Sequence, residues 1–308
     1  MTLSGVHVPL ITPFDEAGAV ALGVLEGLAH EVLAAGAAGL VALGTTAEAT
    51  TLTAAERHQV LEVLTGVCVR RGAPLLVGAN TAEELRALAV HRSVVAALCL
   101  VPPFLRPGED GVVAHFDALA AASPVPLVVY HVPHRTGQDL STGAIRRLAA
   151  IGTVIGIKYA PSAIDGDAVD LLTDPPRGFA VLAGTDELLA PMLALGAHGA
   201  ILASAHLATA QFLALAAAFQ AGQPDQARPL GHQLRRLSAA LFAEPNPAVI
   251  KGVLHAQGHI PTPRVRLPLL PAAVPSIDAA IRHLATFDLQ PLRQGATVTI
   301  PASGRSGP

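Results

Sequence analysis

The chain has 308 residues, of which 51% are hydrophobic, and a formal net charge of −3. Its length allows one large domain or two of average size. The weak negative charge argues against a basic surface for nucleic acid or for an anionic membrane. The first residues have no basic segment of the signal-peptide kind, and no apolar run reaches the ~18 residues of a membrane span. We therefore expect a cytoplasmic protein.

Strands and helices are predicted to alternate as far as about residue 221. Short runs rich in Val, Ile and Leu predict strands at residues 6–10, 40–43, 75–78, 97–100, 127–130, 154–158, 180–183 and 200–203. Longer runs rich in Ala and Leu predict helices at residues 22–35, 53–70, 81–94, 111–122, 141–149, 167–172, 187–195 and 208–221. Continuously apolar strands are typical of a parallel sheet covered on both faces. The pattern predicts a (β/α)8 TIM barrel, with a doubly wound open sheet as the alternative.

Beyond the barrel the pattern becomes purely helical. Helices are predicted at residues 226–242, 248–257 and 277–286. The predicted domains are therefore a catalytic barrel over residues 1–224 and a small C-terminal three-helix region over residues 225–289. Residues 290–308 are rich in Pro, Gly, Ser and Thr, which predicts a flexible tail.

Two predicted loops repeat a Gly-x-x-Gly pattern just before a strand. One contains Gly36 and Gly39, and the other contains Gly196 and Gly199. The first glycine of each pair is expected to end a helix in the left-handed conformation. The second is expected to let the turn approach the sheet closely.

Lysine is rare in this chain, so its positions are informative. Only Lys158 and Lys251 are lysines among 20 Lys and Arg residues. Arginine can replace lysine on a solvated surface, but it cannot form an imine. Lys158 ends a predicted strand, where barrel enzymes place their active sites, so we predict that it is a nucleophile. The alternative for Lys158 is a structural role, as a lysine whose side chain extends to solvent at the strand end or pairs with a carboxylate. Lys251 lies in a predicted surface helix, and for this residue we prefer a structural role.

Hydroxyl groups follow two other predicted strands. Gly44, Thr45 and Thr46 follow the second strand, and the hydroxyl and backbone N–H groups of such a turn can hold a carboxylate. The alternative is an ordinary turn before a helix capped at Thr51 or Thr53. Tyr130 ends the fifth strand, where it could transfer protons at an imine carbon or simply belong to the core.

No metal or nucleotide cofactor is predicted. Cys68 and Cys99 both lie in apolar runs, which favours buried free thiols. His131 and His134 lie close together, but no Cys or carboxylate set joins them as further ligands.

Five collinear stretches resemble the dihydrodipicolinate synthase and N-acetylneuraminate lyase family, and within it the synthases most closely. They are PLITPF (9–14), GTTAE (44–48), YHVPHRTG (130–137), GIK (156–158), and EPNP (244–247) with LPL (267–269). The resemblance implies a TIM barrel with a C-terminal helical region, usually assembled as a homotetramer. It also implies a lyase that takes pyruvate or another 2-oxo acid, together with an aldehyde, without a cofactor.

The resemblance assigns catalytic roles to three residues. Lys158 resembles the lysine that forms a Schiff base with pyruvate. Thr45 and Tyr130 resemble the first two members of a proton relay.

The resemblance also assigns binding roles. Thr46, with Gly44 beside it, resembles the holder of the pyruvate carboxylate. Arg135 resembles the arginine that binds the carboxylate of the incoming aldehyde, a contact that can be bidentate. Ile201 matches a position whose backbone carbonyl lies near the site.

Several positions depart from the family pattern, among them Ala47, where Gly is usual, and Ala49, where a hydroxyl is usual. Two others bear directly on the chemistry. Phe104 stands where the family usually has a tyrosine that reaches into the relay of a neighbouring subunit, and phenylalanine cannot transfer protons. Tyr159 follows the lysine where the synthases generally have Glu. Ser204 or Tyr159 are candidates to replace the lost relay hydroxyl.

Three hypotheses follow for the function. The first is a synthase reaction, in which the pyruvate enamine adds to aspartate semialdehyde. The second is a related aldolase or dehydratase that acts on a 2-keto-3-deoxy sugar acid or similar 2-oxo acid. The third is a barrel that binds a 2-oxo acid without turnover.

Overall fold

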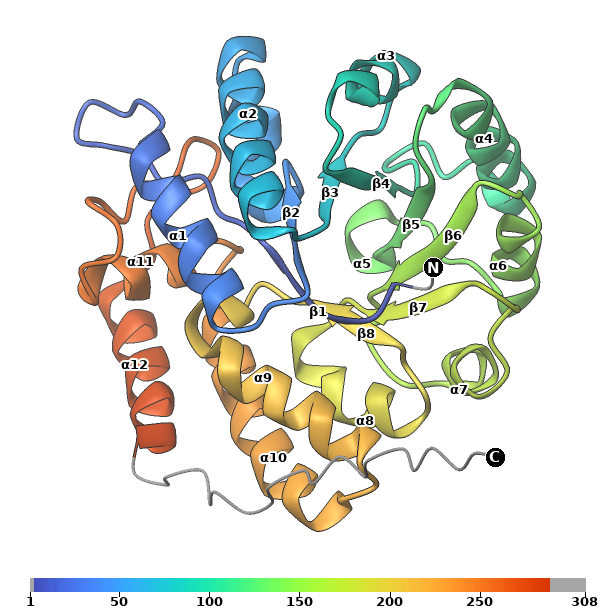
Figure 1. The fold of residues 1–308 in the computed structure, drawn as a ribbon. Coiled ribbons are helices and arrows are strands. Elements are labelled where there is room, and N and C mark those ends of the chain that lie inside the picture. Colours follow the sequence, from blue (N-terminus) through green and yellow to red (C-terminus); the bar gives the residue numbers. More distant parts are fainter. Residues whose placement is uncertain (1–2, 289–308) are drawn as a thin grey trace, which may run out of the picture.

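The structure is a computed structural model that describes residues 3–288. Its parallel strands close into a barrel in chain order, because β1 pairs with both β2 and β8 (Figure 1). The strands are β1 (Gly5–Pro9), β2 (Gly39–Ala42), β3 (Leu75–Gly78), β4 (Val94–Leu100), β5 (Leu127–His131), β6 (Val154–Tyr159), β7 (Ala180–Ala183) and β8 (Gly199–Ile201). The predicted TIM barrel is confirmed, and the alternative of an open sheet is wrong.

Helices surround the barrel and connect its strands (Figure 1). They are α1 (Leu22–Ala34), α2 (Ala54–Arg71), α3 (Ala82–Arg86), α4 (Gly108–Ala122), α5 (Pro133–Thr136), α6 (Thr142–Ala149), α7 (Gly166–Thr173), α8 (Leu189–Ala194) and α9 (Ala205–Gln220). Short 3-10 turns are η1 (Thr45–Ala47), η2 (Ala49–Thr51), η3 (Ala87–Val90) and η4 (Asp186–Leu188). Thr53 begins α2 with a capping box that includes Glu56, so the predicted cap at Thr53 is confirmed.

The hydrophobic core has two layers, which follow from the alternation of side chains along each strand. Val41, Leu76, Leu98 and Leu182 belong to a cluster inside the barrel. Their chain neighbours belong to the larger cluster that the strands share with the helices. Cys68 and Cys99 are buried free thiols in this outer layer, as predicted.

The repeated glycines lie where their small size is needed. Gly36 and Gly196 have φ values of +101° and +112°, in the range that favours glycine. A Cβ atom on Gly39 would lie 2.6 Å from the carbonyl oxygen of Pro74, and one on Gly199 would lie 2.2 Å from that of Gly5. Both predictions for the Gly-x-x-Gly loops are confirmed.

The helix predicted over residues 81–94 begins as expected, with Thr81 as its N-cap, but it is shorter than predicted. The chain forms only α3 and the turn η3, and Val94 already begins β4. Val94 pairs with Leu75 of β3, and β4 pairs with β5 further along. At the end of this Ala- and Leu-rich segment, pairing with the neighbouring strand β3 therefore outweighs the local preference for a helix. The short helix α5 was not predicted.

Three helices follow the barrel: α10 (Pro224–Leu241), α11 (Ala248–Ala256) and α12 (Val274–Asp288). α10 packs on α8 and α9, while α12 packs on α10 and α11 at one side of the ring (Figure 1). The division into a barrel and a separate C-terminal region stays a prediction, and the predicted tail lies outside the described residues.

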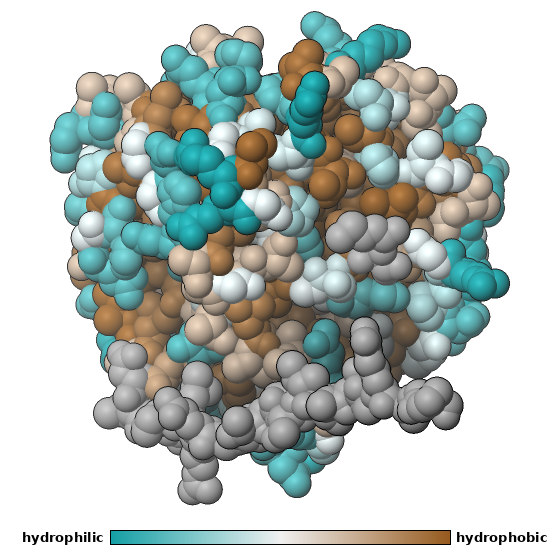
Figure 2. All heavy atoms as spheres, in the orientation of Figure 1, coloured by the Kyte–Doolittle hydropathy of each residue, from teal (hydrophilic) through white to brown (hydrophobic). Residues whose placement is uncertain are grey.

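The surface of the molecule is mixed in character. In Figure 2 hydrophilic side chains occupy most of the outer edge of the view, with hydrophobic ones between them. No helix in residues 3–288 is both long and apolar enough to span a bilayer.

Candidate active site

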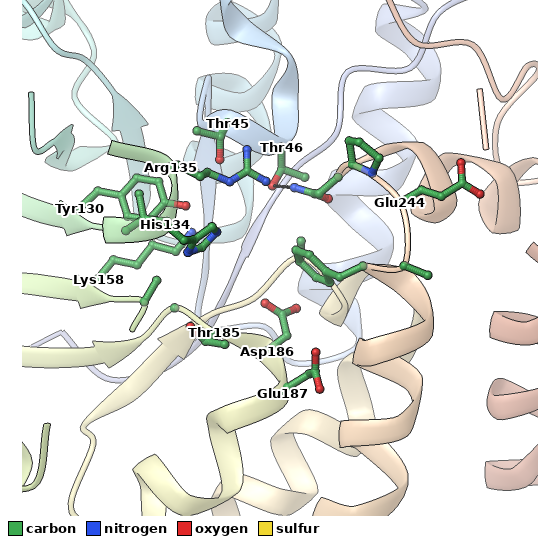
Figure 3. A pocket seen from close by; sticks show the side chains of 18 residues that line it. Thr45, Thr46, Tyr130, His134, Arg135, Lys158, Thr185, Asp186, Glu187 and Glu244 are labelled. Carbon is green, nitrogen blue, oxygen red and sulfur yellow. Dashed lines mark hydrogen bonds between the residues drawn. The ribbon is translucent and has the colours of Figure 1, made fainter. Parts of the chain in front are cut away.

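A cavity of ≈ 510 Å³ opens beyond the carboxyl ends of the strands. Its lining side chains come from loops that follow several different strands and from the segment between α10 and α11 (Figure 3). They are Thr45, Thr46, Tyr130, Val132, His134, Arg135, Lys158, Ala160, Gly184, Thr185, Asp186, Glu187, Ala203, Phe242, Ala243, Glu244, Pro245 and Asn246. The sequence placed the candidate residues at strand ends, and this cavity is where those ends converge.

Lys158 and Tyr130 face each other on adjacent strands. They are register partners in the pairing of β5 with β6, and both are buried. The amine Nζ of Lys158 lies 4.1 Å from the centroid of the Tyr130 ring. Burial raises the pKa of Tyr130, but the charge of Lys158 and a hydrogen bond with Thr45 outweigh it, so the pKa falls below its usual value. This phenol is therefore more acidic than usual and lies beside an amine, as a proton-transfer group requires.

The turn η1 presents the two predicted threonines to the cavity. The side chain of Thr45 is exposed, while that of Thr46 is buried and accepts a hydrogen bond of 2.9 Å from Nδ2 of Asn246. Behind them Thr12 donates a hydrogen bond of 2.8 Å to the carbonyl oxygen of Ala47. These contacts fix the turn from two directions, so its free polar groups are held in place for a ligand.

A cationic edge of the cavity comes from the helix α5. Arg135 and His134 are its exposed side chains, and the cap at Gly137 has a φ of +72°. Partial burial and the charge of Arg135 lower the pKa of His134, which favours its neutral form. Arg135 thus supplies a positive charge to the cavity, and its guanidinium lies beside Thr46 (Figure 3).

The opposite wall carries acidic side chains that the sequence prediction missed. Asp186 and Glu187 begin η4, directly after β7, and both line the cavity. Asp186 is buried, and one of its carboxylate oxygens accepts a hydrogen bond of 2.7 Å from the backbone N–H of Ser204. Burial raises the pKa of Asp186, against the hydrogen bonds from Ser204 and the charge of Lys158. The cavity therefore holds a carboxyl group that takes up a proton more readily than an ordinary aspartate.

Comparison with known proteins identifies the family. The family model described as the dihydrodipicolinate synthetase family matches residues 2–283. The chain belongs to this family. A 4-hydroxy-tetrahydrodipicolinate synthase of Synechococcus elongatus is 37% identical over 272 residues, which cover 86% of this chain and 89% of the relative.

Solved structures of the family have the same fold. The pyruvate complex of a chloride-inhibited dihydrodipicolinate synthase from Acinetobacter baumannii has a TM-score of 0.85 at 32% identity, covering 92% of this chain and 99% of that one. A monomeric dihydrodipicolinate synthase variant has a TM-score of 0.85 at 29% identity, covering 94% of this chain and 98% of the variant.

Most of the site residues predicted from the family resemblance lie together. Lys158, Tyr130, Thr45, Thr46 and Arg135 all line the cavity. Gly44 precedes η1, and Ile201 ends β8 with its side chain inside the barrel. Neither lines the cavity, and their binding roles stay predictions.

Phe104, Tyr159 and the candidate substitute Ser204 do not line the cavity. Phe104 is 91% exposed and has a φ of +70°, so it projects from its loop away from the core. Tyr159 stacks on His131 in the outer layer, with ring centroids 5.4 Å apart. Ser204 is buried and does not line the cavity. Neither hydroxyl therefore faces the space in which a substitute relay member would act.

The cavity contains no obvious metal centre. Among residues 3–288, no group of three or more His, Cys, Asp or Glu side chains converges as metal ligands. His131 lies 3.0 Å from Asp139, but that carboxylate is exposed at the surface.

Proposed function

We propose that this protein is a lyase that condenses pyruvate with aspartate semialdehyde, as a 4-hydroxy-tetrahydrodipicolinate synthase does. The observation that carries the proposal is the meeting of Lys158, Tyr130 and Thr45 in one cavity, in a chain of the dihydrodipicolinate synthetase family. The related synthases at 37% identity support this reaction over one on a 2-keto-3-deoxy sugar acid.

The reaction begins at the amine of Lys158. Its neutral form attacks the carbonyl carbon of pyruvate, and loss of water gives an imine. Loss of a proton from the pyruvate methyl group gives an enamine, whose carbon adds to the aldehyde carbon of the second substrate. Tyr130 and Thr45 carry protons to and from these intermediates, because the phenol lies beside the amine and contacts the threonine hydroxyl.

The carboxylates of the two substrates have separate binding groups in this proposal. Thr46 and the N–H groups of η1 bind the pyruvate carboxylate close to Lys158, and Gly44 directly precedes this turn. Arg135 at the cavity entrance binds the carboxylate of the aldehyde. This arrangement supports an acidic acceptor, because an uncharged aldehyde would leave the guanidinium without its partner.

A direct assay tests the choice of acceptor. Purified protein is incubated with pyruvate and aspartate semialdehyde, and the cyclised product is measured by mass spectrometry. Arg135→Ala is expected to raise KM for the semialdehyde at least tenfold, which corresponds to ~1.4 kcal/mol, and to leave KM for pyruvate nearly unchanged. No product from wild type, while a 2-keto-3-deoxy sugar acid is cleaved or dehydrated, would establish the alternative.

We also propose a homotetramer in the cytoplasm, with Phe104 directed toward a neighbouring subunit. Exposure of the Phe104 ring to water and its positive φ are both unfavourable in free energy in an isolated loop. Both features therefore support a contact with another subunit. Light scattering after size exclusion measures the mass directly. A monomer would contradict the proposal, and a monomeric variant is known in the family.

A further inference from the structure

A buried ion pair lies immediately behind the turn that presents Thr45 and Thr46. The ammonium Nζ of Lys251 lies 2.5 Å from a carboxylate oxygen of Glu48, and the side chains are 0% and 1% exposed. Lys251 belongs to α11, which was predicted to be a surface helix. That prediction is wrong for this residue. Neither member of the pair lines the cavity.

Both charges are fully engaged. Lys251 also donates a hydrogen bond of 2.9 Å to the carbonyl oxygen of Arg264, and its Nζ lies 4.1 Å from the centroid of the Phe14 ring. The second carboxylate oxygen of Glu48 accepts a hydrogen bond of 2.7 Å from the backbone N–H of Arg266. Burial lowers the pKa of Lys251 to about 8 and the Glu48 carboxylate opposes this, so the amine is mainly charged at neutral pH. Such pairing is what allows two charges to remain inside a protein.

The pair acts on the backbone of the turn. Glu48 has a left-handed conformation, with φ 53° and ψ 34°, and joins η1 to η2. Its carboxylate is therefore attached at the point where the chain changes direction after Thr45 and Thr46. Asn246 holds Thr46, and Thr12 holds Ala47, so three successive residues of the turn are fixed by segments distant in sequence.

Stability alone does not account for a pair of this kind. Replacing a buried ion pair by apolar side chains of similar volume is often neutral or stabilising, because both charges must lose their hydration. An apolar pair would fill the same space, but it would not define the direction of the Glu48 side chain or the conformation at its α-carbon. A role in the geometry of the turn would account for keeping both charges.

We propose that Lys251 and Glu48 are positioning residues, which hold the turn from Gly44 to Ala47 in the geometry that binds the carboxylate of the 2-oxo acid. The helix α11, which follows the barrel, thereby supports the active site, although none of its residues lines the cavity. The inference rests on the proposed function, because it assigns that carboxylate to Thr46 and η1.

The test replaces both charges together. In the double variant Lys251→Met/Glu48→Met no unpaired charge is buried, but the carbonyl of Arg264 and the N–H of Arg266 lose their partners. We therefore expect the Tm to fall by several degrees and the protein to remain folded. The concentration of pyruvate that gives half-maximal borohydride trapping on Lys158 is expected to rise at least tenfold. The trapped amount at saturating pyruvate should approach that of wild type, because the nucleophile itself is unchanged.

A second ion pair provides a matched control. Arg57 of α2 pairs with Glu84 of α3, and both side chains are partly buried. Arg57→Met/Glu84→Met makes the same change of chemistry away from the turn, so its half-maximal pyruvate concentration should equal that of wild type. The single variant Glu48→Gln keeps the shape of the side chain and should show an intermediate rise.

Trapping measures capture of the 2-oxo acid and does not depend on the aldehyde. A wild type that traps pyruvate but makes no product with aspartate semialdehyde would refute the proposed acceptor and leave this test intact. Equal half-maximal concentrations for wild type and the folded Lys251→Met/Glu48→Met variant would overturn the positioning role. A wild type that traps no pyruvate would overturn both proposals.

Discussion

Tyr130 and Lys158 depend on each other for their chemistry. The phenol is buried beside the amine, whose charge helps to lower the pKa of Tyr130 against the effect of burial. A proton donor of this kind matters for the steps that form and use the imine, and much less for binding of the substrate carboxylate.

Removal of the hydroxyl tests this division. Tyr130→Phe keeps the ring over the Lys158 side chain but removes the proton, so kcat should fall by roughly 10²-fold. KM for pyruvate should change by less than about threefold, because Thr46 and η1 are untouched. Steady-state kinetics checks both values. A variant with normal kcat would exclude Tyr130 from proton transfer.

Phe104 offers the complementary experiment. The family resemblance assigns a relay tyrosine to this position. Among the described residues, the hydroxyl groups that line the cavity are those of Thr45, Thr46, Tyr130 and Thr185. Phe104→Tyr restores that hydroxyl and should raise kcat by roughly tenfold in the assembled protein. Unchanged kcat in an oligomer would show that the loop does not serve a neighbouring site.

Individual site residues could be predicted where strand ends carry unusual chemistry. Lys158 and Tyr130 were predicted in this way and line the cavity. Asp186 could have been predicted too, since it lies three positions after the end of β7. The pair of Lys251 and Glu48 could not be found, because 203 positions separate them and only the folded chain shows their contact.

At the scale of elements, the strands were easier to predict than the helices. Each strand is a short, continuously apolar run, as expected for a strand of a parallel sheet that is buried on both faces. The helix expected over residues 81–94 is shorter than predicted, and the last residue of that range, Val94, pairs with β3. The short helix α5 has no apolar periodicity to reveal it. Helix boundaries therefore depend on contacts that lie outside the helix.

The pairing of β8 with β1 leaves no room for a side chain at Gly199. Gly199→Ala would place a Cβ atom 2.2 Å from the carbonyl oxygen of Gly5, so we expect a loss of about 3 kcal/mol of stability. Gly23→Ala in α1 is the matched control, because nothing lies within 4 Å of the added atom. Urea unfolding measures both. Equal stability of the two variants would contradict the close approach between β8 and β1.

For the whole molecule, the partly buried His206 and the buried His7 contribute to the response to acid. Desolvation lowers the pKa of His206 to about 4, against a hydrogen bond with the carbonyl oxygen of Ala203. The other ring nitrogen accepts a hydrogen bond of 3.1 Å from the backbone N–H of Ile11, which requires that it carry no proton. His7 is also buried, and desolvation lowers its pKa to about 4 as well.

These histidines predict a loss of stability in mild acid. Between the unfolded pKa of ~6.5 and the folded value of about 4, the unfolded chain binds protons that the folded chain does not, so stability falls as the pH falls. For His206 the loss between pH 7 and pH 5 is about 2 kcal/mol. His206→Gln retains an acceptor for Ile11 but cannot titrate, so its unfolding free energy should depend less on pH in this range. Identical pH dependence of wild type and variant would contradict the assignment.

The central claim is that Lys158 captures pyruvate. The measurement is reduction with sodium borohydride, with and without pyruvate, followed by mass spectrometry of the peptides. We predict a pyruvate-derived adduct on Lys158 that requires pyruvate and is lost in Lys158→Arg, because a guanidinium forms no imine. A folded wild-type protein without this adduct, or with the adduct only on Lys251, would contradict the account.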